Sequence, residues 1–141
     1  MYQIRNKELI ILELYLGDYN ESLYLREVNK NSKIPLKTVQ RILESLETNK
    51  ILKSRLQGKN KYFFLNLENI ETKYKLLQAE IYRTFKFIEN YEFFKTFIKE
   101  IKAIQTPIII FGSFAQFSTD KDSDLDILII SNKKVTLPYY L

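Results

Sequence analysis

The sequence predicts an α+β protein: three short helices and a β-hairpin come first, a long aromatic-rich helix or helix pair follows, and a partial α/β sheet comes last. Two observations support this order. Apolar residues recur at helical spacing through most of the chain, whereas strand-like apolar runs occur in two places, each beside a turn. We therefore expect three parts, at residues 1–68, 69–104 and 105–141.

The composition limits the chemistry that the chain can support. Its 141 residues include no cysteine and no histidine, so disulfides, thiolate metal sites and imidazole bases are excluded. Catalysis would have to depend on carboxylates, hydroxyls, lysines and a bound metal. No apolar run approaches the roughly 18 residues of a membrane span. We expect a soluble, cytoplasmic protein without a membrane partner.

Three short helices are expected before the hairpin. They cover residues 6 to about 19, residues 23 to about 31, and a segment that starts near Pro35 and stops near Asn49. Proline suits the first turn of a helix, because its missing N–H is not needed there. The third helix has a clear apolar stripe, formed by Val39, Ile42, Leu43 and Leu46.

The hairpin is predicted from two strand-like runs, ILKSRL and KYFFLNL, which are joined by a turn that contains Gly58. Glycine can take the positive φ that a tight hairpin demands. Basic residues concentrate in this region: residues 33–61 hold eight lysines and arginines against two acids. That excess is expected on an exposed surface.

Three helices followed by a hairpin resemble the winged helix-turn-helix family, and the resemblance covers nearly half of the chain. In that family the third helix enters the major groove of duplex DNA and the wing reaches neighbouring phosphates or the minor groove. The expected DNA-binding residues are Lys37, Thr38, Gln40, Arg41, Lys53, Arg55, Lys59 and Lys61. The alternatives are that these side chains only keep the domain soluble, or that the domain docks a protein.

Residues 70–102 are expected to be helical, either as one helix or as two that are broken near Asn90. Their apolar stripe consists of Tyr74, Leu77, Ile81, Phe85, Ile88, Phe94, Ile98 and Ile101. This is more apolar surface than a connector requires. It would form a homodimer interface, or it would pack under the first helices or against the C-terminal sheet. A stacking platform for nucleic-acid bases is the third alternative, although the rings alternate with apolar rather than basic neighbours.

A polar constellation lies near the C-terminus, in the stretch FGSFAQFSTDKDSDLDILII. Gly112 and Ser113 follow one apolar run, and Asp124 and Asp126 precede another. On a strand, residues two apart point to the same face, so the two carboxylates are expected side by side. Mg²⁺ takes such oxygen ligands and often shares them with substrate phosphates.

This constellation resembles the signature of the nucleotidyltransferase superfamily that includes DNA polymerase beta, and most closely its minimal prokaryotic branch. The resemblance implies that Gly112 and Ser113 hold the triphosphate of an NTP, and that Asp124 and Asp126 are catalytic and ligate Mg²⁺. The family usually has Arg-Gly where this chain has Gln116 and Phe117. It also supplies a third carboxylate later in the sequence, whereas no acid follows Asp126 here.

Two functions are open at this point. The first is a winged-helix DNA-binding protein, a transcriptional regulator, that carries a degenerate or incomplete nucleotidyltransferase domain and is inactive as this chain. The second is an active Mg²⁺-dependent nucleotidyltransferase whose third carboxylate comes from a missing C-terminal part or from a partner. A helical toxin-type protein partner is a weaker possibility that the resemblance suggests. The last part looks short for its fold, so we expect either a fragment of a longer protein or a reduced form.

Overall fold

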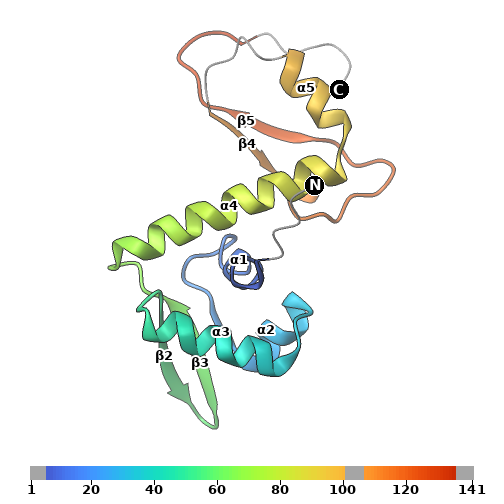
Figure 1. Ribbon diagram of the computed structural model, residues 1–141. Coiled ribbons are helices and arrows are strands. Elements are labelled where there is room, and N and C mark those ends of the chain that lie inside the picture. Colours follow the sequence, from blue (N-terminus) through green and yellow to red (C-terminus); the bar gives the residue numbers. More distant parts are fainter. Residues whose placement is uncertain (1–5, 101–106, 136–141) are drawn as a thin grey trace. The chain divides into compact units, whose positions relative to one another are not determined.

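The structure is a computed structural model that describes residues 6–100 and 107–135. It divides into two compact units, Met1–Arg83 and Thr84–Leu141 (Figure 1). The boundary falls within the long helix α4, Ile70–Asn90. Within the described residues, no helix has the length and apolar character that crossing a membrane requires.

The first unit consists of helices and a three-stranded antiparallel sheet, and it confirms the predicted winged helix-turn-helix arrangement. Its elements before α4 are α1 (Lys7–Glu13), β1 (Ser22–Tyr24), α2 (Leu25–Ser32), α3 (Leu36–Thr48), β2 (Leu52–Gln57) and β3 (Asn60–Leu65). The strands lie in the order β1-β3-β2. Strands β2 and β3 extend beside α3 as the wing (Figure 1).

Helix α3 forms where the sequence predicts it. Pro35 is its N-cap and Asn49 its C-cap. The backbone of Lys33 adopts a left-handed φ of 57°, which turns the chain from α2 into α3. The inner side of α3 is completely buried at Val39 and Leu43. This packing fixes which side of α3 faces outward.

Two boundaries in the first unit differ from the expectation. Helix α1 ends at Glu13 rather than near residue 19. Tyr15, which follows it, is buried and its hydroxyl donates a hydrogen bond to the carbonyl of Phe63 at 3.1 Å. Leu23 was expected to begin a helix, but it lies in β1 and pairs with Phe63 of β3. Both departures arise from long-range contacts with β3, which override the local helical pattern.

The wing closes through the turn that the sequence predicts. Gln57 pairs with Asn60, so Gly58 and Lys59 form a two-residue connection. Gly58 has a φ of +60°. Such positive values match the right-handed twist of the flanking strands, which explains the glycine.

The long helical region is broken into two helices, as one of the two alternatives predicted. Helix α4 ends at Asn90 and α5 spans Phe93–Glu100. The residues of the expected apolar stripe differ in burial. Phe94 is buried, whereas the earlier members Tyr74, Leu77, Ile81 and Phe85 are at least half exposed. Ile101 lies outside the described residues.

The second unit contains a two-stranded antiparallel sheet that is covered on one side by aromatic residues. Its further elements are β4 (Ile108–Phe111), α6 (Gly112–Ala115) and β5 (Asp126–Ile129). A cluster built on Phe87, Phe94 and Phe97 packs against Ile108, Ile110 and Ile127 on one face of the sheet. The other face is exposed at Ile109, Phe111, Leu128 and Ile130.

Candidate functional site

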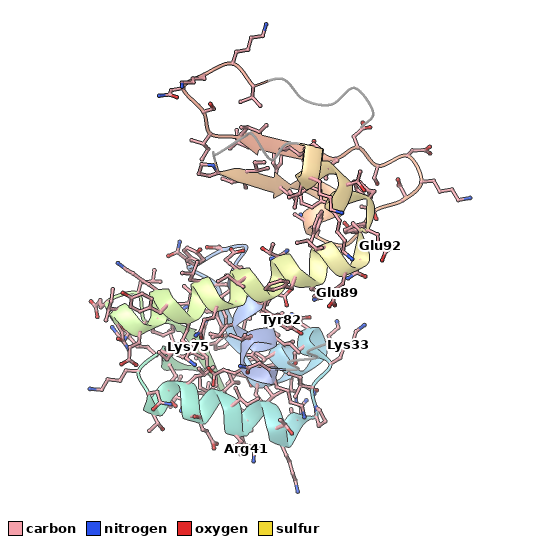
Figure 2. All side chains as sticks on the ribbon, turned by 45° about the horizontal axis from the view of Figure 1, so that its top comes forward. Lys33, Arg41, Lys75, Tyr82, Glu89 and Glu92 are labelled. Atoms are coloured by element: carbon pink, nitrogen blue, oxygen red, sulfur yellow. The ribbon has the colours of Figure 1, made fainter. Side chains whose placement is uncertain are left out.

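The outward side of α3 carries three of the predicted DNA-binding residues. Lys37, Gln40 and Arg41 are exposed, and Thr38 is half-buried at the start of the helix. Arg41 projects from α3 away from the body of the unit (Figure 2). The Gln40 amide donates to the carboxylate of Glu44 at 2.9 Å. The first two turns of α3 therefore offer two cations and an oriented amide to a ligand.

The basic residues of the wing differ from one another in their partners. Lys53 forms an ion pair with Glu68, and Lys61 forms one with Glu47 at 2.6 Å. In residues 6–100 and 107–135, Lys59 has no acidic partner, and it is exposed in the turn of the wing. The charges of Lys53 and Lys61 are thus partly neutralised within the protein, whereas that of Lys59 is available to a ligand.

Arg55 lies on β2 of the wing, and its side chain extends across β3 toward β1. Its guanidinium is 3.5 Å from the hydroxyl of Ser22 and 5.7 Å from the centre of the Phe64 ring. Both contacts orient the side chain without neutralising it, since neither partner is an acid. Arg55 therefore keeps its charge at the surface of the wing.

The ion pair between Lys61 and Glu47 also changes the pKa of Glu47. Hydrogen bonds from Lys61, and then from Ser54, lower the pKa of Glu47 below its ordinary value. Glu47 therefore remains ionised to a lower pH than an isolated glutamate. The pair ties the end of α3 to the wing, because Glu47 belongs to α3 and Lys61 to β3.

A hollow of about 310 Å³ lies between α3, the start of α2 and the tip of the wing. Its lining includes Gln40, Lys59 and Lys61, which the sequence singled out, and Arg26 and Asn60, which it did not. Arg26 is exposed in the first turn of α2. The signal that could have found Arg26 is its position, because the helix before a recognition helix crosses the DNA backbone.

In the second unit, Gly112 and Asp126 come into close contact. Phe111 pairs with Asp126 across β4 and β5, which brings the aspartate beside the next residue, Gly112. Gly112 has a φ of +70°, and a Cβ added to it would lie 2.1 Å from Oδ2 of Asp126. Only glycine fits there without displacing the carboxylate. The structure thus brings together two of the four residues that the nucleotidyltransferase resemblance names.

Asp124 and Ser113 flank this contact. Asp124 precedes β5 and shares the exposed side of the chain with Asp126, because burial alternates from Ser123 to Ile130. Ser113 is in the short helix α6, and its carbonyl accepts hydrogen bonds from the backbone N–H and the hydroxyl of Ser118, at 3.0 and 3.4 Å. These bonds close the loop that follows α6.

The loop before β5 is ordered by its own side chains. Asp120 accepts a hydrogen bond from the Ser123 hydroxyl at 2.8 Å and one from the backbone N–H of Asp122 at 3.1 Å. These bonds, first that of Ser123, lower the pKa of Asp120 below its ordinary value. The carboxylate of Asp120 is therefore engaged in hydrogen bonds within the loop. Within the part of the chain that the structure describes, no three acidic residues gather into a metal-binding group.

Phe117 occupies a position where the nucleotidyltransferase family usually has glycine. Its φ is 56°, so the left-handed backbone conformation is retained without the glycine. The ring stacks on Tyr91 at 6.1 Å, and the ammonium of Lys86 lies 5.0 Å from its centre. Packing against these neighbours compensates for the strain of a left-handed aromatic residue.

The comparisons with known proteins agree with this division of the chain. Residues 92–139, about a third of the chain, match the nucleotidyltransferase domain family. No curated protein gives a significant match. The chain is also similar to solved structures, three of which are 18–20% identical to it.

Three solved structures are representative. AF1382 from Archaeoglobus fulgidus is 20% identical with a TM-score of 0.49, over 59% of this chain and 91% of that one. MepR, a transcription regulator of the Staphylococcus aureus multidrug efflux pump MepA, is 18% identical with a TM-score of 0.47, over 74% and 82%. BpsR of Bordetella bronchiseptica, whose DNA binding is regulated by 6-hydroxynicotinic acid, is 18% identical with a TM-score of 0.43, over 55% and 54%.

Proposed function

We propose that this chain is a DNA-binding regulator that contacts duplex DNA through α3 and the wing. One observation carries the proposal: in the described part of the chain, exposed cations without an acidic partner lie both on α3, at Lys37 and Arg41, and on the wing, at Arg55 and Lys59, within one compact unit. Lys59 and Arg26 line the hollow itself, and Arg41 follows Gln40 on α3. A phosphate backbone that passes between a recognition helix and a wing needs cations in this arrangement.

The polar residues of α3 are the candidates for reading bases. Gln40 can make bidentate contacts to adenine, and Thr38 can contact a base edge or a thymine methyl group. The Glu44 carboxylate accepts a hydrogen bond from the Gln40 amide, which limits the directions in which the Gln40 side chain can point. The lysines and Arg41 would set the position of the protein on the phosphates rather than read sequence.

Anisotropy of a fluorescein-labelled, mixed-sequence DNA duplex tests this proposal. The Arg41→Ala/Lys59→Ala variant should bind more weakly, and the slope of log K against log salt should become shallower by about 2, because two cations no longer meet phosphates. Lys133→Ala/Lys134→Ala is the matched control, because it removes the same charge from an exposed segment of the second unit. Equal binding by the two double variants would rule out α3 and the wing as the DNA interface.

A second candidate function rests on the contact between Gly112 and Asp126. That contact, beside the exposed Asp124, supports a site for Mg²⁺ together with an NTP. Two carboxylates fit Mg²⁺ when phosphate oxygens and water complete its shell. Ser113 and the α6 turn would face the phosphates, and the bound ion would supply charge neutralisation. We expect binding with no transfer or very slow transfer, since only two carboxylates are assigned to the site.

Calorimetric titration with Mg²⁺ and ATP tests this second function. Binding that is present in the natural sequence should be lost in Asp124→Asn/Asp126→Asn and retained in Asp122→Asn, which removes a carboxylate from the exposed loop. Binding that survives the double substitution would place the nucleotide elsewhere. Clear nucleotidyl transfer by the chain alone would contradict the expectation of a slow or inactive enzyme.

A further inference from the structure

The three-stranded sheet of the first unit has two faces of different character. The inner face belongs to the core of the unit and is buried at Leu23, Leu52, Phe63 and Leu65. Successive side chains of a strand lie on opposite faces, so the residues that alternate with these four point to the other side. We call this other side the outer face. The register places on it Ser22 and Tyr24 of β1, Lys53, Arg55 and Gln57 of β2, and Asn60, Tyr62 and Phe64 of β3.

The outer face carries three aromatic residues, Tyr24, Tyr62 and Phe64, which we call the ring cluster. All three are partly exposed, and none of them is among the partly buried residues that pack against the core. Tyr24 and Tyr62 pair across β1 and β3, with ring centres 5.5 Å apart and planes tilted by 60°. Tyr62 and Phe64 follow one another on the same side of β3, about 7 Å apart along the strand. Tyr62 is thus the central ring of the cluster.

Basic side chains border the ring cluster on β2. Arg55 pairs with Tyr62, and Lys53 pairs with Phe64. The Arg55 guanidinium lies 5.7 Å from the centre of the Phe64 ring and keeps its charge, whereas Lys53 shares its charge with Glu68. No residue of the outer face is acidic. The charge of this face therefore complements an anionic partner, and its rings complement flat apolar groups.

Unpaired nucleotides combine these two properties, because each has a phosphate and a base with an open π-face. Stacking of bases on aromatic side chains beside a basic track is the usual way in which proteins hold single strands. The bases of a duplex are stacked on one another and offer mainly their edges to a protein. A protein partner would bury apolar surface without a need for the cations. The outer face therefore fits a single-stranded nucleic acid better than it fits a duplex or a protein.

The outer face continues into the hollow beside α3. Tyr24 and Asn60 belong to both surfaces, since they lie on the outer face and also line the hollow. A strand that separates from a duplex bound at α3 and the wing would reach the ring cluster from this hollow. This continuity favours DNA over RNA as the occupant. The choice of DNA rests on the proposed function, whereas the stacking surface itself does not.

We propose that the outer face binds single-stranded DNA, with unpaired bases stacked on the ring cluster and Arg55 on a phosphate. Three rings in a row across β1 and β3 can hold two or three bases. The affinity should depend most on Tyr62, because a base stacked there is next to both of the other rings. The contact is independent of base sequence, since every base has a π-face.

Fluorescence anisotropy with a labelled oligothymidine of about ten nucleotides tests this inference. The natural sequence should bind it at low salt, and Tyr62→Leu should raise the dissociation constant at least about fivefold, because the central ring is lost. Tyr62→Phe should bind like the natural sequence, since it keeps the ring. Tyr74→Leu is the matched control, because Tyr74 is 63% exposed but lies on α4 rather than on the sheet. No binding at low salt, or equal weakening by Tyr62→Leu and Tyr74→Leu, would overturn the proposal.

Cross-linking locates the contact in the natural protein, so its result does not depend on how well a variant folds. A complex with an oligonucleotide that contains iododeoxyuridine is irradiated, and the linked peptides are identified by mass spectrometry. Cross-links should occur at Tyr24, Tyr62 or Phe64. Cross-links confined to residues 82–97, which are also rich in aromatic side chains, would place the strand on that segment and overturn the proposal.

Two comparisons separate this inference from the proposed function. Arg41→Ala should weaken duplex binding but leave the affinity for oligothymidine unchanged, because Arg41 lies on α3 and not on the sheet. Loss of oligothymidine binding in Arg41→Ala would contradict a separate surface for single strands. Oligothymidine binding by a protein that does not bind duplex DNA would support the outer face and contradict the duplex proposal alone. An oligouridine RNA of the same length that binds at least about tenfold more tightly would overturn the choice of DNA.

Discussion

Replacing Gly112 by alanine tests the closest contact in the candidate nucleotide site. An alanine at a φ of +70° is strained, and its Cβ would meet Oδ2 of Asp126 at 2.1 Å. The left-handed conformation costs an L-residue about 1–2 kcal/mol. The carboxylate must also withdraw, and an off-rotamer side chain costs about 0.5–1.5 kcal/mol. Together these penalties should destabilise the β4–β5 region by about 1.5–3.5 kcal/mol.

Gly58→Ala supplies the reference for this prediction. Gly58 also has a positive φ, of +60°, but nothing lies within 4 Å of the Cβ that would be added. It should show the conformational penalty alone, about 1–2 kcal/mol. Hydrogen-exchange mass spectrometry reports the opening free energies of the wing and of β4–β5 in separate peptides. A destabilisation by Gly112→Ala no larger than that by Gly58→Ala would refute the contact between Gly112 and Asp126.

Two further predictions concern the stability of the first unit. Tyr15→Phe should cost about 1 kcal/mol in urea unfolding, because it removes a buried hydrogen bond; an unchanged midpoint would contradict the bond to Phe63. Burial raises the pKa of Tyr15, so the folded state keeps its proton above the ordinary value of 10.0 while the unfolded chain loses it. Stability should therefore fall as pH rises beyond 10.0, and less so in Tyr15→Phe. Glu47 has the opposite linkage. Because its pKa is lower in the folded protein than the ordinary value of 4.5, ionised Glu47 stabilises the fold when the pH is above 4.5. This stabilisation is lost as the pH falls through the pKa of Glu47 in the folded state. Glu47→Gln should thus be less stable than the natural sequence at pH 7, and this difference should shrink on acidification; a difference that is independent of pH would contradict the role of the Lys61 pair.

The helix-turn-helix and the wing could be predicted because their signals are local. Pro35 and Asn49 delimit α3, and Gly58 marks the turn of the wing. Strand β1 could not be predicted in this way, because three residues are too few to show an alternating pattern. It exists through its pairing with β3, about 40 residues later in the chain.

The faces of α4 show a different limit of sequence reasoning. The periodicity identifies the stripe that contains Tyr74 and Leu77, but it does not indicate that Leu76 and Ala79, on the other side, form the core contact. Both sides of the helix carry apolar residues, and the choice between them depends on which one packs against α1 and α3. The expected stripe was therefore correct as a pattern and incomplete as a description of burial.

The candidate sites were predicted as residue types rather than as contacts. The turn at Gly112 and the pair of aspartates could be recognised separately, but their meeting depends on the register that pairs Phe111 with Asp126. Likewise, the sequence indicates a basic wing but not that Lys61 is paired with Glu47, which lies 14 positions away. Arg26 joins the hollow only because α2 and the wing fold toward the same side of α3.

The most direct test of the central claim is the salt dependence of duplex DNA binding by the full chain. The first turn of α2, the outer side of α3 and the wing carry five exposed cations for which the described residues supply no acidic partner: Arg26, Lys37, Arg41, Arg55 and Lys59. If about four or five of them contact phosphates, log K should fall with log salt at a slope of about −4. A slope near zero, or no binding at low salt, would contradict the account of α3 and the wing as a DNA interface.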